Sequence, residues 1–386
     1  MKKRYTYKLR PGEKAVALLT RHAGTCRWVW NECVKRLENR DSTTQTNLMR
    51  HLTELRHSTD WLGSQPVVPQ QQVIRDFIVA RKAFFDKTRN KPKIKKKLNT
   101  QPSLNYTKRG FSINKNGRLR LAGGIIIPVV WSRPFPSPPS SVRVYRDSAG
   151  WWWASFVCET ENKTKPRENN GKIGIDWGVK TPATTTNTKF DLEYTPRVKT
   201  NAQRLAKYQK QMAIHRKNKD WKSYNKAKKK AAKLHRKIKN QRREQTRRWA
   251  QKIAKNHEVI AAEDFKPKFT QTNRKMAKKA TENAIGIAKQ ELENAAQKYG
   301  CELIMIDPKY TTMDCSKCGA RHKTRLELKI RTFKCENCGA SLNRDYNAAR
   351  NMLIRAGFNP SGDEGCKTAN CSSDGERLAE PGIPRL

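Results

Sequence analysis

The chain has too few acidic residues to balance its basic ones. Its 386 residues contain 34 Asp and Glu against 82 Lys and Arg, which gives a formal net charge of +48. Self-repulsion at such a charge destabilises a compact state unless a polyanion neutralises it. The charge pervades the chain and no lipid-inserting apolar helix accompanies it, which disfavours a membrane surface or a merely solvated basic surface. We therefore expect a nucleic-acid partner, bound with an affinity that falls steeply with salt.

Long apolar segments are missing as well. No run of about 18 or more apolar residues occurs, so the sequence predicts no transmembrane helix. The first eight residues, MKKRYTYK, contain no apolar signal core. We therefore expect a cytoplasmic protein that meets its nucleic acid there, without a membrane partner. Whether it acts as a monomer or a dimer stays open.

Cysteine is present, and four of the ten cysteines are paired by spacing. Cys315 and Cys318 form one CxxC, Cys335 and Cys338 form a second, and a Gly that permits a tight turn follows each pair. Disulfides are the alternative, but an intracellular protein of this size more often uses such pairs for metal. Four thiolates fit tetrahedral Zn²⁺, and no thiolate is replaced, so we expect a structural zinc ribbon. The other cysteines are expected as core thiols or tail residues: Cys26, Cys33, Cys158, Cys301, Cys366 and Cys371.

The first 160 residues alternate between strand and helix patterns. Helices are expected over 12–39 and 45–57, and a third carries the apolar stripe from Val73 to Phe85. Asn116-Gly117 between two short apolar segments is the strongest short hairpin signal. Further strands are expected over 4–10, 142–145 and 151–157. The pattern indicates an open β-barrel or a sheet with a helical insertion.

The remaining residues predict an α/β arrangement. Strands are expected over 172–175, 183–193, 259–262 and 303–306, and helices over 281–299 and from about 345 to 355. The strongly basic segment 201–250 is typical of two long helices joined near Asn218, whose basic faces suit nucleic acid better than plain solvation. From Gly357 onward the chain is polar and rich in Gly, Pro and Ser, and we expect a disordered tail.

Three acidic residues stand where chemistry would need them. Asp176 directly follows an apolar strand, Glu263 ends another, and Asp345 begins a helix. Acids that face one another repel unless cations neutralise them, and such a cluster holds two Mg²⁺ about 3.5–4 Å apart in phosphodiester cleavage. The alternative is that Asp345 caps its helix and that the other two are turn residues.

The periodicity of the sequence does not by itself select these three acids, because three other acids lie in similar positions. Strand alternation should point Asp264 away from its neighbour Glu263, while Asp307 and Asp314 also lie near strand ends.

These acids lie within ordered motifs that resemble the TnpB family, the transposon-encoded RNA-guided nucleases related to type V CRISPR effectors. The resembling segments are Gly174–Lys180 and Ala262–Phe265, similar to the first two RuvC motifs, then Asp307–Thr312, Cys315–Gly319, Thr332–Gly339 and Asn343–Ala349, similar to the ribbon and the third motif. Weaker likeness covers Thr6–Pro11, Cys26–Asn31 and Ala83–Phe85. Trp177 stands where the family usually has a smaller aliphatic residue, which puts rate rather than reaction type in question.

The resemblance implies the fold class. It is an α/β RuvC or RNase H-like nuclease domain, with a five-stranded mixed sheet and an inserted zinc ribbon, plus an N-terminal wedge-like β-barrel with a helical recognition insertion. The implied domains are 1–162, with the insertion at about 36–95, for RNA and target-adjacent-motif recognition; 163–314 with 340–356 for the nuclease; 315–339 for the ribbon; and 357–386 as the tail.

The resemblance also implies the activity. It is an RNA-guided DNA endonuclease that cuts double-stranded DNA beside a short target-adjacent motif, with Asp176, Glu263 and Asp345 holding two Mg²⁺. The guide RNA would derive from the transposon end, and its base pairing would supply sequence specificity. Gln70, Gln71, Gln72 and Arg75 could reach base edges, and an ordinary polar helix face is the alternative for each. The candidate basic contacts are Lys95, Lys96, Lys97, Arg236, Arg242 and Arg243.

Four other interpretations remain. A compact type V CRISPR effector would use the same chemistry and differ only in genomic context. A nuclease-inactive RNA-guided DNA-binding repressor would usually have lost a carboxylate, and none is lost here. An RNA-independent resolvase-like or RNase H-like nuclease leaves the large basic N-terminal half unexplained. A sequence-specific transposase would have to show strand transfer.

Overall fold

The protein is described here by a computed structural model, which describes residues 1–97, 100–161, 164–178, 181–194, 196–264, 284–324, 326 and 330–360. The chain divides into two compact units. The N-terminal unit consists of Met1–Asn162 and Ile214–Lys233, and the C-terminal unit of Lys163–Ala213 and Leu234–Leu386. The disordered tail is expected from Gly357 onward, and all but its first four residues lie outside the described residues.

Two antiparallel sheets form the framework of the N-terminal unit. The larger sheet has the order β2-β7-β8-β1-β6, and the smaller has the order β3-β4-β5. The strands are β1 (Lys2–Leu9), β2 (Ser103–Thr107), β3 (Phe111–Ile113), β4 (Leu119–Leu121), β5 (Ile125–Ile127), β6 (Val129–Val130), β7 (Ser141–Arg146) and β8 (Trp152–Glu159). Both sheets are open in the described residues, so the wedge-like β-barrel that the resemblance implied is not supported, whereas the alternative of a sheet with a helical insertion agrees with the structure. Closing a barrel requires the two outer strands to pair, and here β2 and β6 remain edges.

The predicted hairpin around Asn116-Gly117 is confirmed. Strands β3 and β4 pair antiparallel, with Phe111 opposite Leu121 and Ile113 opposite Leu119. Gly117 has φ +68°, a left-handed conformation that glycine adopts without steric cost. The turn therefore determines the register of the small sheet.

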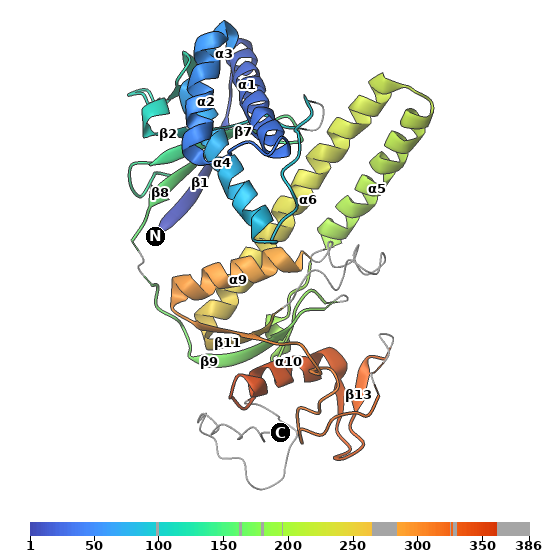
Figure 1. Cartoon of the computed structure of the whole chain (residues 1–386). Coiled ribbons are helices and arrows are strands. Elements are labelled where there is room, and N and C mark those ends of the chain that lie inside the picture. Colours follow the sequence, from blue (N-terminus) through green and yellow to red (C-terminus); the bar gives the residue numbers. More distant parts are fainter. Residues whose placement is uncertain are drawn as a thin grey trace. The chain divides into compact units, whose positions relative to one another are not determined.

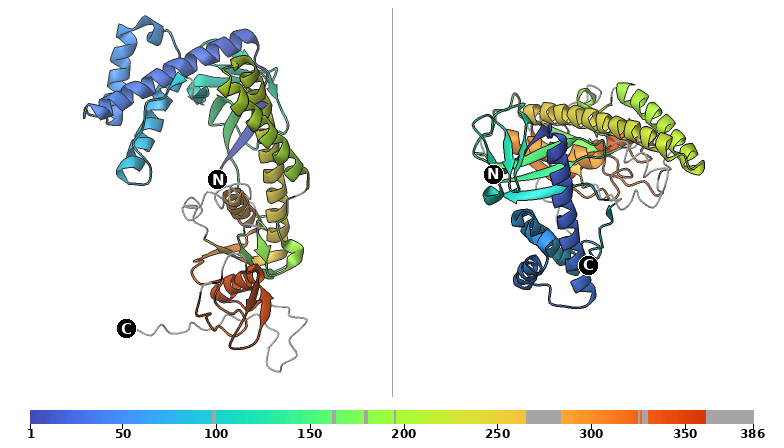
Figure 2. Two further views of the ribbon diagram at one scale, coloured as in Figure 1. Left: turned by 90° about the vertical axis from the view of Figure 1, so that its right-hand side faces the viewer. Right: turned by 90° about the horizontal axis from the view of Figure 1, so that it is seen from above.

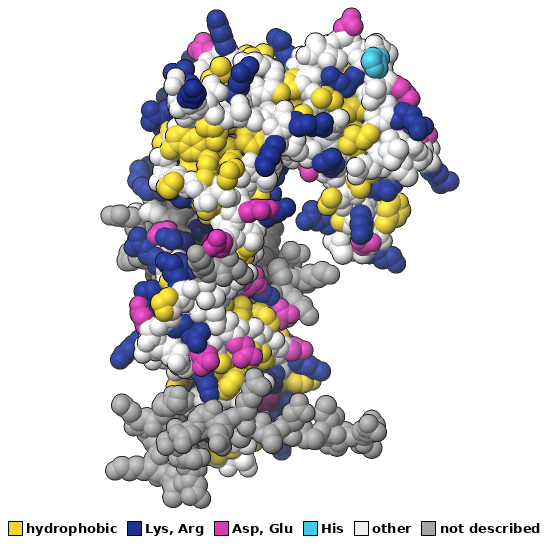
Figure 3. All heavy atoms as spheres, turned by 90° about the vertical axis from the view of Figure 1, so that its left-hand side faces the viewer, with side chains coloured by type: hydrophobic (Ala, Val, Ile, Leu, Met, Phe, Trp, Pro, Cys, Tyr) yellow, Lys and Arg dark blue, Asp and Glu magenta, His cyan; other side chains and the backbone are white. Residues whose placement is uncertain are grey.

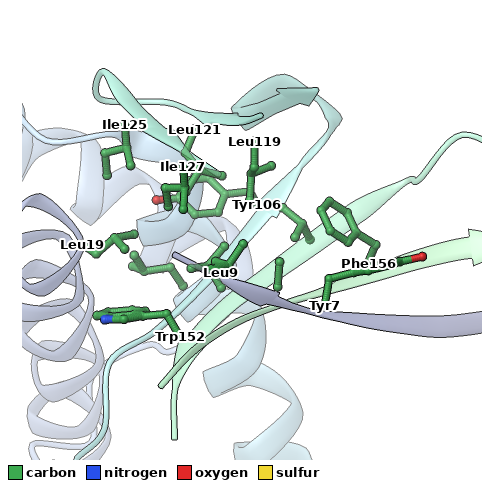
Figure 4. Close-up of a cluster of buried hydrophobic side chains, with 14 of the residues drawn as sticks. Tyr7, Leu9, Leu19, Tyr106, Leu119, Leu121, Ile125, Ile127, Trp152 and Phe156 are labelled. Atoms are coloured by element: carbon green, nitrogen blue, oxygen red, sulfur yellow. The ribbon is translucent and has the colours of Figure 1, made fainter. Parts of the chain in front are cut away.

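The unit also contains four helices, α1 (Glu13–Glu38), α2 (Gln45–Ser58), α3 (Asp60–Gly63) and α4 (Val67–Phe85). Of these, α1 and α4 pack against the strands. Figure 4 shows the core between the sheets and α1, where Leu19 meets side chains from β1, β2, β4, β5 and β8. A second cluster joins the helices to one another, with Trp30 edge-to-face against Phe77 at 5.6 Å between ring centroids. The four helices thus share a core of their own.

Two long helices form an antiparallel hairpin, as the basic segment predicted. They are α5 (Pro196–Lys217) and α6 (Trp221–Asn256), and they lie side by side in Figures 1 and 2. Lys219 takes a left-handed conformation in the connection, at φ +56°. Asp220 then accepts a hydrogen bond from the backbone N–H of Ser223 at 3.0 Å, which satisfies a free donor at the start of α6.

A mixed sheet forms the centre of the C-terminal unit, with the order β10-β9-β11-β12. The strands are β9 (Gly171–Asp176), β10 (Thr184–Thr185), β11 (His257–Glu263) and β12 (Glu302–Ile306). β11 is parallel to both β9 and β12, whereas β10 is antiparallel to β9. The described residues thus contain four of the five strands that the resemblance implied.

Helices cover both faces of this sheet. Ile260 and Ala262 of β11 pack in a cluster with residues of α6 and of α9 (Ile285–Tyr299). Val259 and Ala261, which alternate with them, pack with α10 (Arg344–Arg355). The sheet is therefore buried on both sides, as expected for parallel strands. No helix in the described part of the chain is long and apolar enough to cross a membrane.

Candidate active site and metal centre

Strand register brings two of the three candidate carboxylates to the same end of the sheet. Ala262 of β11 lies opposite Ile175 of β9 in a parallel ladder, and the next residue of each strand is Glu263 and Asp176. Side chains alternate across a strand. Ile175 and Ala262 face α6 and α9, so Asp176 and Glu263 point to the opposite face, where α10 lies.

Gly174 brings α10 onto that face. A Cβ added at Gly174 would collide with the backbone carbonyl oxygen of Ala349, so only glycine permits this contact between β9 and α10. Figure 1 shows α10 lying along the sheet beside β9 and β11.

The contact at Gly174 determines where Asp345 lies. Asp176 is two residues along the strand from Gly174, or about 6.6 Å. Asp345 precedes Ala349 by four residues on the helix, which is about 6 Å along the axis and on the same side. The two steps are nearly equal, and the charge of Asp345 acts on Asp176, so Asp345 lies near Asp176.

The start of α10 is organised around Asp345. Asn343 caps the helix, and its side-chain oxygen accepts from the backbone N–H groups of Asp345 and Tyr346 at 3.0 and 3.2 Å. This excludes the alternative in which Asp345 itself is the cap. Its carboxylate lies 3.3 Å from Nη1 of Arg331 and 4.0 Å from Nε of Arg344. Asp345 is therefore held by cations on one side while it faces the other carboxylates.

The electrostatics show that the carboxylates are close. Burial raises the pKa of Asp176 well above its ordinary value, the negative charges of Glu263 and Asp345 raise it further, and Arg344 opposes them. Burial also raises the pKa of Glu263, to about 7, against a hydrogen bond from Trp177 that lowers it. Such a cluster is costly without a cation, which is typical of a site that binds one.

Trp177 holds Glu263 through two hydrogen bonds. Its backbone N–H donates to Oε2 of Glu263 at 3.3 Å, and its indole N–H donates to the backbone carbonyl of Glu263 at 3.0 Å. The ring is 7% exposed and packs edge-to-face on Trp249. Sequence reasoning noted Trp177 only as a departure from the family. The available signal was that a buried indole needs an acceptor for its N–H.

The other acids near strand ends form ion pairs or hydrogen bonds away from the three candidate carboxylates. Asp264 points away from Glu263, as alternation predicted, and pairs with Lys289 of α9 at 2.7 Å. Asp314 pairs with Arg321 at 2.6 Å and with Arg355 at 2.7 Å. Asp307 accepts from the backbone N–H of Lys309. These contacts give all three a structural explanation.

The four paired cysteines are arranged so that they could hold one metal ion. Sγ of Cys315 lies 3.7 Å from Sγ of Cys338, and Sγ of Cys318 lies 3.6 Å from Sγ of Cys335. A tetrahedron with Zn–S bonds of about 2.3 Å has edges of about 3.8 Å. Within the described parts of the chain, these cysteines are the only group of three or more possible ligands whose donor atoms all lie within 4.8 Å. The group thus fits zinc, and the three carboxylates are spread more widely.

The two halves of the cysteine site repeat one local geometry. Cys315 and Cys335 each donate a backbone N–H to the carbonyl five residues on, and each accepts from the glycine four residues on. Both glycines, Gly319 and Gly339, have positive φ. Strands β13 (Thr332–Lys334) and β14 (Ser341–Asn343) pair antiparallel beside the second half. This is the architecture of a zinc ribbon.

Side-chain amides attach the ribbon to α10. Asn347 donates to the carbonyl of Asp314 at 2.8 Å and accepts from the backbone N–H of Ser316 at 2.9 Å. One turn later, Asn351 donates to the carbonyls of Thr311 and Asp314. Both amides are buried. The first cysteine pair thus braces the helix that carries Asp345, which agrees with the structural role expected for the ribbon.

The candidate base-reading residues of α4 differ in exposure. Gln70 is fully buried, where it accepts from Arg56 at 2.7 Å and donates to the carbonyl of Leu62 at 3.3 Å. The expectation that Gln70 reaches a base edge is therefore wrong, because the folded helices use both ends of its amide. Gln71 and Gln72 are partly buried, and Arg75 is exposed.

The candidate basic residues for nucleic-acid contacts also differ in exposure and in whether they have partners within the protein. Lys95 lies over the ring of Trp30, with its Nζ 3.4 Å from the ring centroid, whereas Lys96 and Lys97 are exposed. On α6, Arg243 pairs at 2.8 Å with Glu291, whose side chain is 8% exposed. Arg242 lies over Tyr194, and Arg236 is partly buried. Lys95 and Arg243 thus have structural partners. On the face shown in Figure 3, Lys and Arg side chains are scattered over the surface, with fewer acidic side chains among them.

Comparison with known proteins agrees with this architecture. Residues 155–284 match a family model described as "Probable transposase", residues 286–352 match the Cas12f1-like TNB domain, and residues 1–41 match a helix-turn-helix domain. A solved Cas12f1–sgRNA–target DNA complex is similar in fold, with a TM-score of 0.58 at 14% identity over 91% of this chain and 98% of that one. The fold is therefore RuvC-like, with a four-cysteine cluster that fits a zinc ribbon.

Two relatives that align over nearly their whole length identify the family to which the chain belongs. A Streptomyces pristinaespiralis protein, named as a proposed RNA-guided DNA endonuclease, is 30% identical over 408 aligned positions, which cover 100% of this chain and 99% of the relative. The Escherichia coli (strain K12) protein InsQ, named in the same way, is 28% identical over 90% of this chain and 91% of the relative. The chain belongs to the TnpB family.

Proposed function

We propose that this protein is a transposon-encoded, RNA-guided endonuclease that cuts double-stranded DNA beside a short target-adjacent motif. The observation that carries the proposal is the meeting of Asp176, Glu263 and Asp345 at one end of the sheet. Family membership and the RNA-guided names of the full-length relatives support the guided activity. The positive charge of the chain suits both nucleic-acid partners.

The donor set fits Mg²⁺. Carboxylate oxygens are the ligands that this hard cation prefers. Burial raises the pKa of both Asp176 and Glu263, and the negative charges of Glu263 and Asp345 raise the pKa of Asp176 further. Bound Mg²⁺ would activate a water and stabilise the leaving oxygen of a phosphodiester. Asp176 and Glu263 would hold the ions from the rigid sheet, and Asp345 from α10. Trp177 keeps Glu263 oriented, and the ribbon keeps α10 in place.

We assign the remaining expected roles on the same basis. Residues 1–162 would recognise the RNA and the target-adjacent motif, with Gln71, Gln72 and Arg75 facing the DNA. Lys96 and Lys97, which are exposed, would contact phosphates, together with Arg236 and Arg242. Residues 163–314 with 340–356 would form the nuclease, and 315–339 the ribbon. The guide RNA would come from the transposon end.

The test compares two aspartate substitutions in the full-length protein with its co-purified RNA. Asp176→Ala should abolish cleavage of a matched plasmid while leaving the Kd for RNA unchanged. Asp307→Ala, directly after β12, serves as the control and should cut at the wild-type rate. Cleavage by Asp176→Ala at a comparable rate would refute the assignment of the site.

Sequencing the co-purified RNA tests the guide separately. A discrete species with a constant scaffold from the transposon end and a variable 3′ segment is expected. A species with CRISPR repeats would favour the CRISPR effector, and random fragments would contradict guided targeting.

A further inference from the structure

An open pocket on the N-terminal unit is lined by aromatic and basic side chains. Its volume is about 530 Å³, and its lining residues are Ile113, Trp131, Ser132, Arg133, Pro134 and Phe135. That volume lies within the range of about 300–1,000 Å³ that is typical of small-molecule sites. The pocket belongs to none of the sites described above.

The aromatic wall is rigid. Trp131 and Phe135 pack against each other with ring centroids 5.3 Å apart, and both pack on the buried Tyr7 at 4.8 and 5.4 Å. The indole N–H of Trp131 donates to the carbonyl of Gly117 at 2.8 Å, and the hydroxyl of Tyr7 donates to the carbonyl of Arg133 at 3.2 Å. The rings are therefore held in place before any ligand arrives.

Despite this packing, the wall stays accessible. Trp131 is 37% exposed, although its N–H is already used. What it offers a ligand is therefore an aromatic surface and not a hydrogen bond. A planar aromatic group is the natural occupant of such a surface.

The charges around the pocket identify the rest of the ligand. Arg133 is exposed, with its guanidinium 5.1 Å from the ring of Tyr5 and 5.5 Å from that of Tyr7. Lys115 and Arg118, both exposed, lie on the turn whose Gly117 binds Trp131. No Asp or Glu occurs in the sequence between Lys87 and Arg146. A ligand with a planar ring and an adjacent negative charge fits this combination.

We propose that this pocket binds one unpaired nucleotide of the guide RNA, with the base on Trp131 and Phe135 and a phosphate near Arg133. Bases in a duplex are stacked on their neighbours and cannot present a free face, whereas unpaired bases stack on aromatic side chains. A preformed pocket suits the RNA scaffold, which is the same in every complex, better than a DNA strand that changes with the target. The inference rests on the proposed function for the identity of the RNA.

The experiment maps ultraviolet cross-links between the full-length protein and its co-purified RNA, without DNA. We expect a peptide containing Trp131 to be linked to one scaffold position. Trp131→Leu keeps an apolar side chain and should lose this cross-link and weaken RNA binding about tenfold, within the range for loss of one stacked base. Arg133→Gln should weaken binding and make its salt dependence shallower, because it removes a phosphate contact.

Trp61→Leu is the matched control. Trp61 is 49% exposed and packs on Trp28, away from the pocket residues in sequence and in ring contacts. It should keep both the cross-link and the wild-type Kd. Equal thermal midpoints of the two Leu variants would exclude misfolding as the cause of weaker RNA binding in Trp131→Leu. Arg133→Gln provides a second test, because Arg133 is exposed and its replacement leaves the packing of the core unchanged.

Two outcomes would overturn the pocket assignment. One is wild-type RNA affinity in Trp131→Leu, and the other is a cross-link map in which only peptides outside 131–135 appear. The Asp176→Ala protein should retain the cross-link, so loss of cleavage and loss of the pocket contact are separable. If the wild-type protein carries no discrete RNA, the proposed function fails. Binding of oligouridylate that does not depend on Trp131 would then refute the pocket itself.

Discussion

Replacing Glu263 with Gln should stabilise the metal-free protein while it destroys activity. Glu263 has its pKa raised from 4.5 to about 7, first by burial. Each tenfold change in acidity corresponds to about 1.4 kcal/mol, so the ionised carboxylate costs the folded state up to about 3 kcal/mol. Glutamine keeps the shape and removes the charge. We expect a gain of about 1–3 kcal/mol at pH 8 in EDTA, because local relaxation lowers the full cost.

The sign of the pH dependence follows from proton binding. The folded state binds the Glu263 proton more tightly than the unfolded state, so folding stability falls as pH rises from 4.5 through about 7. The advantage of Glu263→Gln should therefore be absent near pH 4.5 and complete by pH 8. Millimolar Mg²⁺ should reverse the order, because a cation that binds only the folded wild-type protein stabilises it by mass action.

Thermal midpoints at pH 5 and pH 8, with EDTA or Mg²⁺, measure this. A gain of about 5 °C at pH 8 in EDTA is expected for Glu263→Gln. The control is Glu258→Gln on the same strand, where the carboxylate is exposed and only 3.9 Å from Arg167, and where the change should be near zero. If the thermal midpoint does not rise at pH 8, or rises equally at pH 5, the ionised Glu263 does not destabilise the folded state and the reasoning is refuted.

Three further substitutions test the support of the site. Cys335→Ser should release zinc, measured by elemental analysis, and lose cleavage with it; an active zinc-free protein would contradict the bracing role of the ribbon. Asn347→Ala removes two hydrogen bonds between the ribbon and α10, worth about 1–3 kcal/mol together, and should slow cleavage while zinc content stays unchanged. Arg243→Ala removes the ion-pair partner of the buried Glu291 and should lower the free energy of unfolding by about 1–2 kcal/mol. The loss is kept small because Arg243 itself is largely exposed. Adding Glu291→Gln should restore part of the loss, measured by urea unfolding.

Local patterns in the sequence predicted most elements of the fold. The CxxC pairs, the Asn116-Gly117 hairpin and the apolar strands before Asp176 and Glu263 each depend on neighbouring residues, and the structure contains them all. Strand alternation was enough to separate Asp264 from Glu263.

Contacts between distant segments were not predictable in the same way. Barrel closure depends on whether the edge strands β2 and β6 meet, and no local pattern reports that. Gln70 had the right residue type for base recognition, but Arg56 and Leu62 occupy its amide. The fit of Gly174 against Ala349 joins residues far apart in the sequence, and it determines the geometry of the site.

The position of α10 in the chain has a consequence for synthesis. Asp345 lies on the last helix of the described residues, after both cysteine pairs. A ribosome delivers Asp176 and Glu263 first, and the strands that carry them can pair as soon as β11 emerges. On the proposed assignment, the third carboxylate arrives only after Cys335 and Cys338 have left the exit tunnel. On that assignment, the nascent chain would be unable to cut nucleic acid until α10 has folded, and metal binding by the ribbon that contacts α10 would be one of the last steps before the nuclease becomes active.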